Sequence, residues 1–311
     1  QACAAETEQW VQIHEGRAAA FPARAHELRQ RMSALGIDQW MSWGYQSTDL
    51  VELCMTSGQA ICGWMIGLGK ARMAAALALM GGGRCNLIVL QANLINEFAE
   101  EMRGIGMDPA LWKVIEKPAD LEQLALINVI SYTRLRMPVR KGSDMTYAQR
   151  LRRRVHSSIA DEGDCISKDS QQVAALYSVC ARRRYALSGT PIGNYPRDLL
   201  GLAQWVAGDG IASQPYGKRR PFIDPVLMNS MIAAERGLDV WRDRFTTTEW
   251  VTAEWEDTLS SGAKKEVPVL SGVDDYRAFA STLVLRRIWE EPEVAAYIKV
   301  PKPTREVIEL P

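Results

Sequence analysis

A glycine-rich segment followed by a lysine could bind phosphate groups. The segment GWMIGLGKAR contains Gly67, Gly69 and Lys70. A strand that ends in Gly-x-Gly-Lys and opens a helix presents backbone N–H groups and the helix N-terminus to an anion, while the lysine reaches the outer phosphates. A glycine-rich turn without a ligand is the alternative, because Trp64 replaces the usual first glycine and Ala71 the usual Ser or Thr.

Two adjacent carboxylates could activate water. Asp161 and Glu162 follow the apolar run SSIA. In a nucleoside triphosphatase the first acid binds Mg²⁺, directly or through water, and the second orients or deprotonates the attacking water. An acidic helix N-cap and first turn is the alternative for this pair.

A third segment, Ser188-Gly189-Thr190-Pro191, directly follows the apolar run RYAL. Small hydroxyl residues at the carboxyl end of a strand lie where an open α/β sheet places its ligand contacts. Read alone, the segment is also explained by an ordinary turn. The three segments therefore carry more weight together than separately.

The elements that must position these residues are short apolar runs alternating with helical periodicity. The runs AICGWMI, NLIVL, INVISY, SSIAD and RYALSGT are typical of strands in a parallel sheet covered on both faces. Helices are expected over 72–80 and 94–102. We expect a helical segment over 1–40, an α/β domain over 41–205, a helical and irregular appendage over 206–285, and an extended exit segment over 286–311.

Together, these segments resemble the first RecA-like lobe of superfamily-2 helicases of the Swi/Snf remodeller type. WMIGLGKA corresponds to that family's DEMGLGKT, DEGD to its DEAH box, and RYALSGTPIGN to its R-x-x-L-T-G-T-P-x-x-N. GYQSTDLVEL supplies the Tyr-Gln element that precedes the loop, and LIVLQANLINEFAEE and VISYTRLR resemble motifs Ia and Ib. The resemblance covers about residues 40 to 205 and implies a P-loop nucleoside-triphosphatase fold with a mostly parallel sheet.

The resemblance also implies a role for each matching residue. Its cofactors would be ATP and Mg²⁺, and its partners double-stranded DNA, contacted through the backbone, and a second RecA-like lobe. The catalytic residues would be Lys70, Asp161 and Glu162, with Asp161 as the metal ligand. The nucleotide would contact Gln46, Gly67, Gly69, Lys70 and Ala71. Coupling of the nucleotide to DNA would involve Ser188, Gly189 and Thr190, and the DNA backbone would contact Gln91, Asn93, Ser131 and Thr133.

Three departures from the family pattern affect hydrolysis. Ala71 removes the hydroxyl that would bind Mg²⁺, Trp64 replaces an acid, and Asp164 replaces the histidine of the acid box. The implied function is the ATP-binding lobe of a DNA translocase that alone binds ATP weakly and hydrolyses little. The alternative is a nucleotide switch or interaction scaffold that does not hydrolyse ATP. An unrelated P-loop kinase is disfavoured by the SGTP segment.

Composition limits the other classes of function. Lys plus Arg and Asp plus Glu number 37 each, so a polyanionic partner would have to bind local basic clusters, at 150–154, 182–184 and 218–220. Six scattered cysteines indicate reduced thiols without a zinc site, and no membrane span is expected, which favours a cytoplasmic or nucleoid-associated protein. Trp241, Trp250 and Trp255 could form a stacking surface or simply pack helices, and the appendage could bind a protein partner.

Overall fold

A seven-stranded parallel sheet forms the centre of the part of the chain that the structure describes. This computed structural model describes residues 17–56, 58–167, 170–192, 196–208, 216, 221–223, 231–252 and 264–298. The sheet has the order β11–β1–β6–β5–β2–β4–β3, and all its neighbouring strands pair in parallel. Its strands are β1 (Gln59–Trp64), β2 (Asn86–Leu90), β3 (Trp112–Val114), β4 (Ile127–Ser131), β5 (Ser157–Ala160), β6 (Arg183–Leu187) and β11 (Val284–Arg287).

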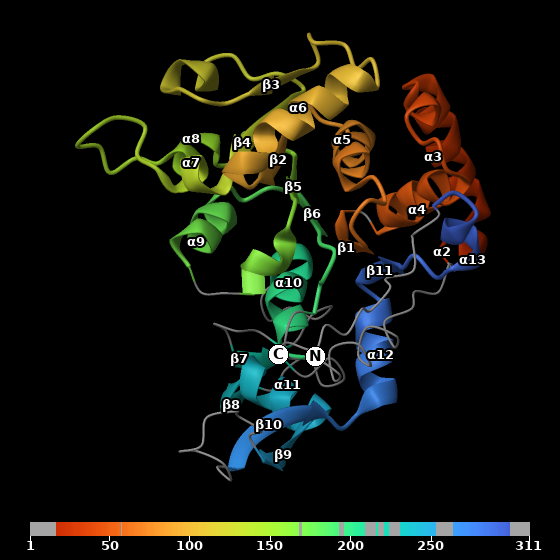
Figure 1. Cartoon of the computed structure of the whole chain (residues 1–311). Helices are drawn as coiled ribbons and strands as arrows, with labels where there is room; N and C mark the ends of the chain where they lie inside the picture. The colour runs from red at the N-terminus through yellow and green to blue at the C-terminus, as the bar shows by residue number, and fades with distance from the viewer. Residues whose placement is uncertain are drawn as a thin grey trace, which may run out of the picture.

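Helices cover both faces of this sheet (Figure 1). In β2, Leu87 and Val89 belong to one apolar cluster and Ile88 and Leu90 to the other, because successive side chains of a strand point to opposite faces. One face packs against α3 (Pro22–Ala34), α4 (Gly44–Met55), α5 (Lys70–Met80) and α6 (Ile95–Gly104). The other packs against α7 (Tyr132–Arg136), α8 (Tyr147–Leu151), α9 (Gln171–Ser178) and α10 (Asp198–Ala207). The expected α/β fold, with a parallel sheet and helices on both faces, is confirmed.

The strands expected from the apolar runs are β1, β2, β4, β5 and β6. Two further strands, β3 and β11, were not expected and occupy the two edges of the sheet. Short elements complete this part: α2 (Arg17–Ala20), η1 (Ile37–Gln39), η2 (Ala92–Leu94), η3 (Pro118–Leu121), η4 (Gly163–Ser167) and α13 (Pro292–Ala295). Strand β11 crosses the expected boundary at 285/286, and α10 crosses the one at 205/206. The division of the chain into domains stays a prediction.

The described part of the appendage contains strands as well as helices. Helices α11 (Gly237–Phe245) and α12 (Val273–Ser281) accompany two antiparallel pairs: β7 (Pro221–Ile223) with β8 (Met231–Arg236), and β9 (Thr246–Thr252) with β10 (Lys264–Leu270). The β-branched run TTTEWVT explains β9, which the expectation of a helical appendage overlooked. The appendage lies at one end of the sheet, at the bottom of Figure 1.

Trp241 packs inside this appendage. Its side chain is 0% exposed, and its ring centroid lies 5.2 Å from that of Phe245 and 5.8 Å from that of Tyr276. Helix packing therefore accounts for Trp241, and a surface for stacking bases does not. The side chain of Trp250, the whole of Trp255, the cluster 218–220, and residues 1–16 and 299–311 lie outside the described residues. In the described part of the chain, no helix combines the length and hydropathy that a membrane span would need.

Candidate nucleotide-binding site

The glycine-rich segment forms the turn between β1 and α5. Gly67 and Gly69 have φ values of 84° and 91°, a left-handed conformation that glycine adopts without steric cost. Helix α5 then begins at Lys70. The Lys70 Nζ donates to the carbonyl oxygens of Trp64, at 3.3 Å, and Met65, at 3.4 Å. The lysine and the helix N-terminus therefore lie together at this turn, and groups of this kind can bind phosphate.

Gln46 holds this turn against helix α4. Its Nε2 donates to the Leu68 carbonyl oxygen at 3.0 Å, and its Oε1 accepts from the Trp43 backbone N–H at 3.3 Å. A Cβ on Gly69 would lie 2.7 Å from that Nε2, so a larger residue at this position would displace the Gln46 amide. The expected adenine contact of Gln46 stays a prediction, because the buried amide here contacts the protein's own backbone.

Asp161 and Glu162 lie at the carboxyl end of β5. The Tyr132 hydroxyl donates to the Asp161 carbonyl oxygen at 2.8 Å, and Asp161 Oδ1 accepts from the Glu162 backbone N–H at 3.1 Å. Glu162 has a φ of 50°, a conformation that is uncommon for a non-glycine residue and concentrates at functional sites. Burial, with Asp161 9% exposed, and the neighbouring Glu162 charge together raise the pKa of Asp161 to about 6, although Lys70 opposes the shift.

A cavity of about 440 Å³ brings the phosphate-binding and acidic residues together. Lys70 lines it with Asp161 and Glu162, and Leu94 and Phe98 add apolar surface from η2 and α6. Its other described lining residues are Ile66, Gly67, Gly69, Ala71, Leu90, Glu97 and Glu101. One lysine therefore faces four carboxylates in the lining, of which Glu101 pairs with Arg72. Such a cavity disfavours a bare polyanion and favours one that carries a divalent cation.

The SGTP segment lies beside Lys70. Ser188 is buried, and its Oγ accepts from the Thr190 backbone N–H at 3.1 Å. A Cβ on Gly189 would lie 3.6 Å from Lys70 Nζ. The glycine-rich, acidic and SGTP segments follow β1, β5 and β6. They thus lie along the same edge of the sheet, the one formed by the carboxyl ends of its strands.

The residues expected to contact DNA follow β2 and β4 at this same edge. Asn93 and Thr133 are exposed and Gln91 is partly exposed. Ser131 is only 6% exposed, and its Oγ caps α7 by accepting from the Arg134 backbone N–H at 3.0 Å. Its hydroxyl therefore already has a structural partner. In the described basic clusters, the side chains of Arg150, Arg152, Arg153 and Arg154 are exposed.

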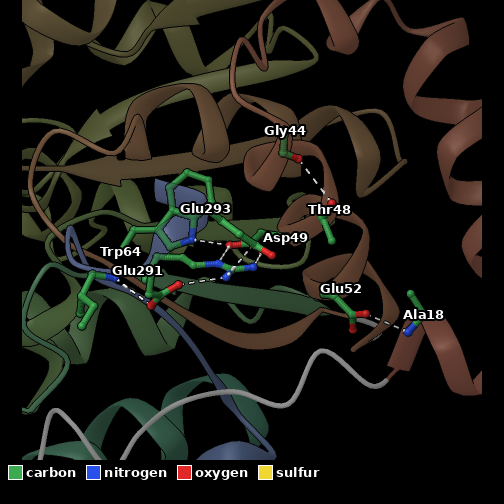
Figure 2. A network of polar contacts seen from close by, with 10 residues as sticks. Ala18, Gly44, Thr48, Asp49, Glu52, Trp64, Glu291 and Glu293 are labelled. Carbon is green, nitrogen blue, oxygen red and sulfur yellow. Dashed lines mark hydrogen bonds and ion pairs between the residues drawn. The ribbon is translucent and has the colours of Figure 1, made fainter. Parts of the chain in front are cut away.

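Two arginines of β11 belong to the site although the motifs did not reveal them. Arg287 forms a buried ion pair with Asp49 of α4, with nitrogen–oxygen distances of 2.7 and 2.9 Å, and Trp64 Nε1 donates to the same carboxylate at 2.9 Å (Figure 2). Arg287 also contacts Glu291 and Glu293. Its neighbour Arg286 contacts Gly63, near the end of β1, and Gly189 in the SGTP segment. The only sequence signal was two adjacent charges in an otherwise apolar run, LVLRRI.

Comparison with solved structures identifies the fold. The chain is similar to the Sulfolobus solfataricus SWI2/SNF2 ATPase core in complex with double-stranded DNA, at 16% identity and a TM-score of 0.53, over 81% of this chain and 46% of that one. It is also similar to the Pyrococcus furiosus Hef helicase domain, at 17% identity and a TM-score of 0.44, over 55% of this chain and 38% of that one. No protein-family model and no curated protein matches the sequence.

The chain therefore has the fold of a RecA-like domain, a parallel sheet with helices on both faces, as expected from its motifs. It spans less than half the length of either similar structure.

Proposed function

We propose that the chain is the ATP-binding lobe of an ATP-dependent motor that moves on double-stranded DNA. The observation that supports this most is the cavity in which Lys70, Asp161 and Glu162 meet at the carboxyl edge of a helicase-type sheet. The similar Sulfolobus structure is itself an ATPase core in complex with double-stranded DNA.

Each residue of the cavity has a distinct part in this proposal. Lys70 and the N-terminus of α5 bind the triphosphate, and Asp161 would hold Mg²⁺, which would offset the negative charge of the phosphates. Among the described residues no group of three or more His, Cys, Asp or Glu side chains could hold a metal ion, so Asp161 would hold the cation only together with the bound nucleotide. Glu162 orients the attacking water. A second lobe supplies the remaining catalytic groups.

DNA lies across the same edge of the sheet in this proposal. Asn93 and Thr133, with Gln91 and Ser131, contact the sugar–phosphate backbone, and the Ser188–Pro191 segment links these contacts to the nucleotide. Such contacts position a protein on DNA without reading its sequence. Closure of the two lobes around ATP then advances the motor by a hinge movement.

Replacement of Lys70 by Ala tests the nucleotide site. We expect the variant to bind ATP with Mg²⁺ about 10–100-fold more weakly than the wild type, the cost of one lost charge-assisted hydrogen bond. EDTA should have a similar effect on the wild type because of the acidic lining. Titration with a fluorescent ATP analogue measures both. Lys113→Ala is the control, since Lys113 lies on the edge strand β3, away from the cavity, and its Nζ donates to the Gln123 carbonyl oxygen. Equal affinities for the wild type and the Lys70 variant would refute the assignment.

Ala71 favours the second candidate function, a nucleotide switch that does not hydrolyse ATP. Ala71→Thr restores a hydroxyl beside Lys70, and Ala71→Val gives the same shape without the hydroxyl. For a motor that lacks one Mg²⁺ ligand, we expect the threonine variant alone to bind ATP about tenfold more tightly with Mg²⁺, and to gain hydrolysis that double-stranded DNA stimulates. Identical behaviour of the two variants, in binding and in phosphate release, would favour the switch.

A further inference from the structure

Arg286 joins the end of β1 to the SGTP segment through one nitrogen atom. Its side chain is 4% exposed, and its Nη1 donates to the carbonyl oxygens of Gly63 and Gly189, both at 2.7 Å. Gly63 lies in β1, just before the glycine-rich turn, and Gly189 lies in the SGTP segment beside Lys70. Charge-assisted hydrogen bonds of this length are stronger than neutral ones. The guanidinium therefore fixes the separation between the two backbones.

The packing around this contact leaves little room for another arrangement. A Cβ on Gly63 would lie 3.3 Å from Arg286 Cδ and 3.3 Å from Pro191 Cγ. Strand pairing alone does not hold the loops, because the ladder between β1 and β6 ends with Cys62 opposite Leu187. Beyond that point, Arg286 supplies a bridge between the segments that continue from β1 and β6.

We propose that Arg286 is a positioning residue of the nucleotide site, which holds the phosphate-binding turn and the SGTP segment at the spacing that ATP requires. The inference rests on the proposed function and deepens it. Two further contacts from the same stretch support it. Arg287 binds Asp49 on the helix that carries Gln46, and Trp289 Nε1 donates to the Ile66 carbonyl oxygen in the turn at 3.0 Å. The segment from β11 to α13 thus holds the site from one side.

Arg183 offers a matched control on the same sheet. Its Nη1 also donates to a backbone carbonyl oxygen, that of Gly81, at 2.6 Å. This contact lies at the start of β6 and the end of α5, at the amino ends of the strands and on the opposite side from the cavity. Arg183→Met removes a comparable arginine–carbonyl bridge without touching the site.

The experiment compares Arg286→Met, Arg286→Lys and Arg183→Met with the wild type in thermal unfolding, in amide hydrogen exchange without nucleotide, and in binding of ATP with Mg²⁺. We expect Arg286→Met to speed exchange selectively in 65–69 and 188–191 and to weaken ATP binding by about tenfold, the equivalent of one lost charged hydrogen bond. Arg286→Lys keeps a donor and a charge, so its exchange rates and ATP affinity should fall between those of the wild type and Arg286→Met. It provides the comparison if the methionine variant does not fold. Arg183→Met should lower Tm but change neither readout.

Unchanged or uniformly faster exchange in the Arg286 variants would overturn the positioning role, as would an ATP affinity that falls equally in Arg183→Met. A wild-type chain that does not bind ATP would refute the proposed function. The exchange data would then still decide whether Arg286 sets the loop spacing.

Discussion

Replacement of Asp161 by Asn is expected to stabilise the nucleotide-free protein by about 2–3 kcal/mol at pH 8 and to abolish Mg²⁺-dependent binding of ATP. Burial raises the pKa of the Asp161 carboxyl from 3.8 to about 6, so its charged form is disfavoured in the folded state. Because its pKa is raised, the Asp161 carboxyl makes a contribution to wild-type stability that is fully present below pH 4 and is lost as the pH rises through 6. The asparagine avoids this loss, but it removes the charge that binds Mg²⁺.

Urea unfolding at pH 4 and pH 8, together with ATP titration, measures this effect. The stability difference between the variant and the wild type should be small at pH 4 and should reach its full size above pH 6. Asp144→Asn, at an exposed position, is the control and should change stability by less than about 0.5 kcal/mol at either pH. A variant less stable than the wild type at pH 8, or one that binds ATP normally, would contradict the role given to Asp161.

Replacement of Arg287 by Met should destabilise the fold by about 3–5 kcal/mol, the largest loss that we expect from a single side chain. Asp49, 0% exposed, would keep its hydrogen bond from Trp64 but lose the cation that accompanies its buried charge. Removing one partner of a buried pair costs more than removing both, since the remaining charge is left uncompensated. The double variant Asp49→Leu with Arg287→Met should therefore recover part of the loss.

Chemical denaturation followed by tryptophan fluorescence gives the free energies of unfolding of the wild type, of Arg287→Met and of the double variant. Arg24→Ala serves as the reference, because Arg24 and Glu27 form a pair at 2.7 Å whose side chains are 58% and 63% exposed. Its loss should cost no more than about 1 kcal/mol. Should Arg287→Met behave like Arg24→Ala, the buried network would have no special importance for stability.

The sequence predicted those strands that form continuous apolar runs, but it predicted neither of the two edge strands of the sheet. Strands β3, WKV, and β11, VLRR, are short and contain charged residues, so their composition does not separate them from loops. The pairing of β11 with β1 depends on contacts between distant parts of the chain, which local patterns do not record. In the appendage, the expectation of helices overlooked β9, although its β-branched run TTTEWVT is a local signal for a strand.

The candidate site divides in the same way. Lys70, Asp161 and Glu162 were predictable because a strand end, a glycine turn and an acid pair are local patterns. The contacts of Gln46 and the two arginines were not, because a buried side chain's hydrogen-bond partner depends on the tertiary structure. Trp64 illustrates the point: it replaces an acid in the family pattern, and its indole N–H donates to the carboxylate of Asp49 on helix α4.

The position of β11 beside β1 also has a consequence for biosynthesis. Arg286 and Gly63 are 223 positions apart in the chain. At translation rates of about 5–20 residues per second, β1 waits roughly 10–45 s for its edge partner. During that time its outer edge has unpaired backbone groups that can pair with other chains. The order of synthesis therefore delays completion of this edge of the sheet until β11 has been made.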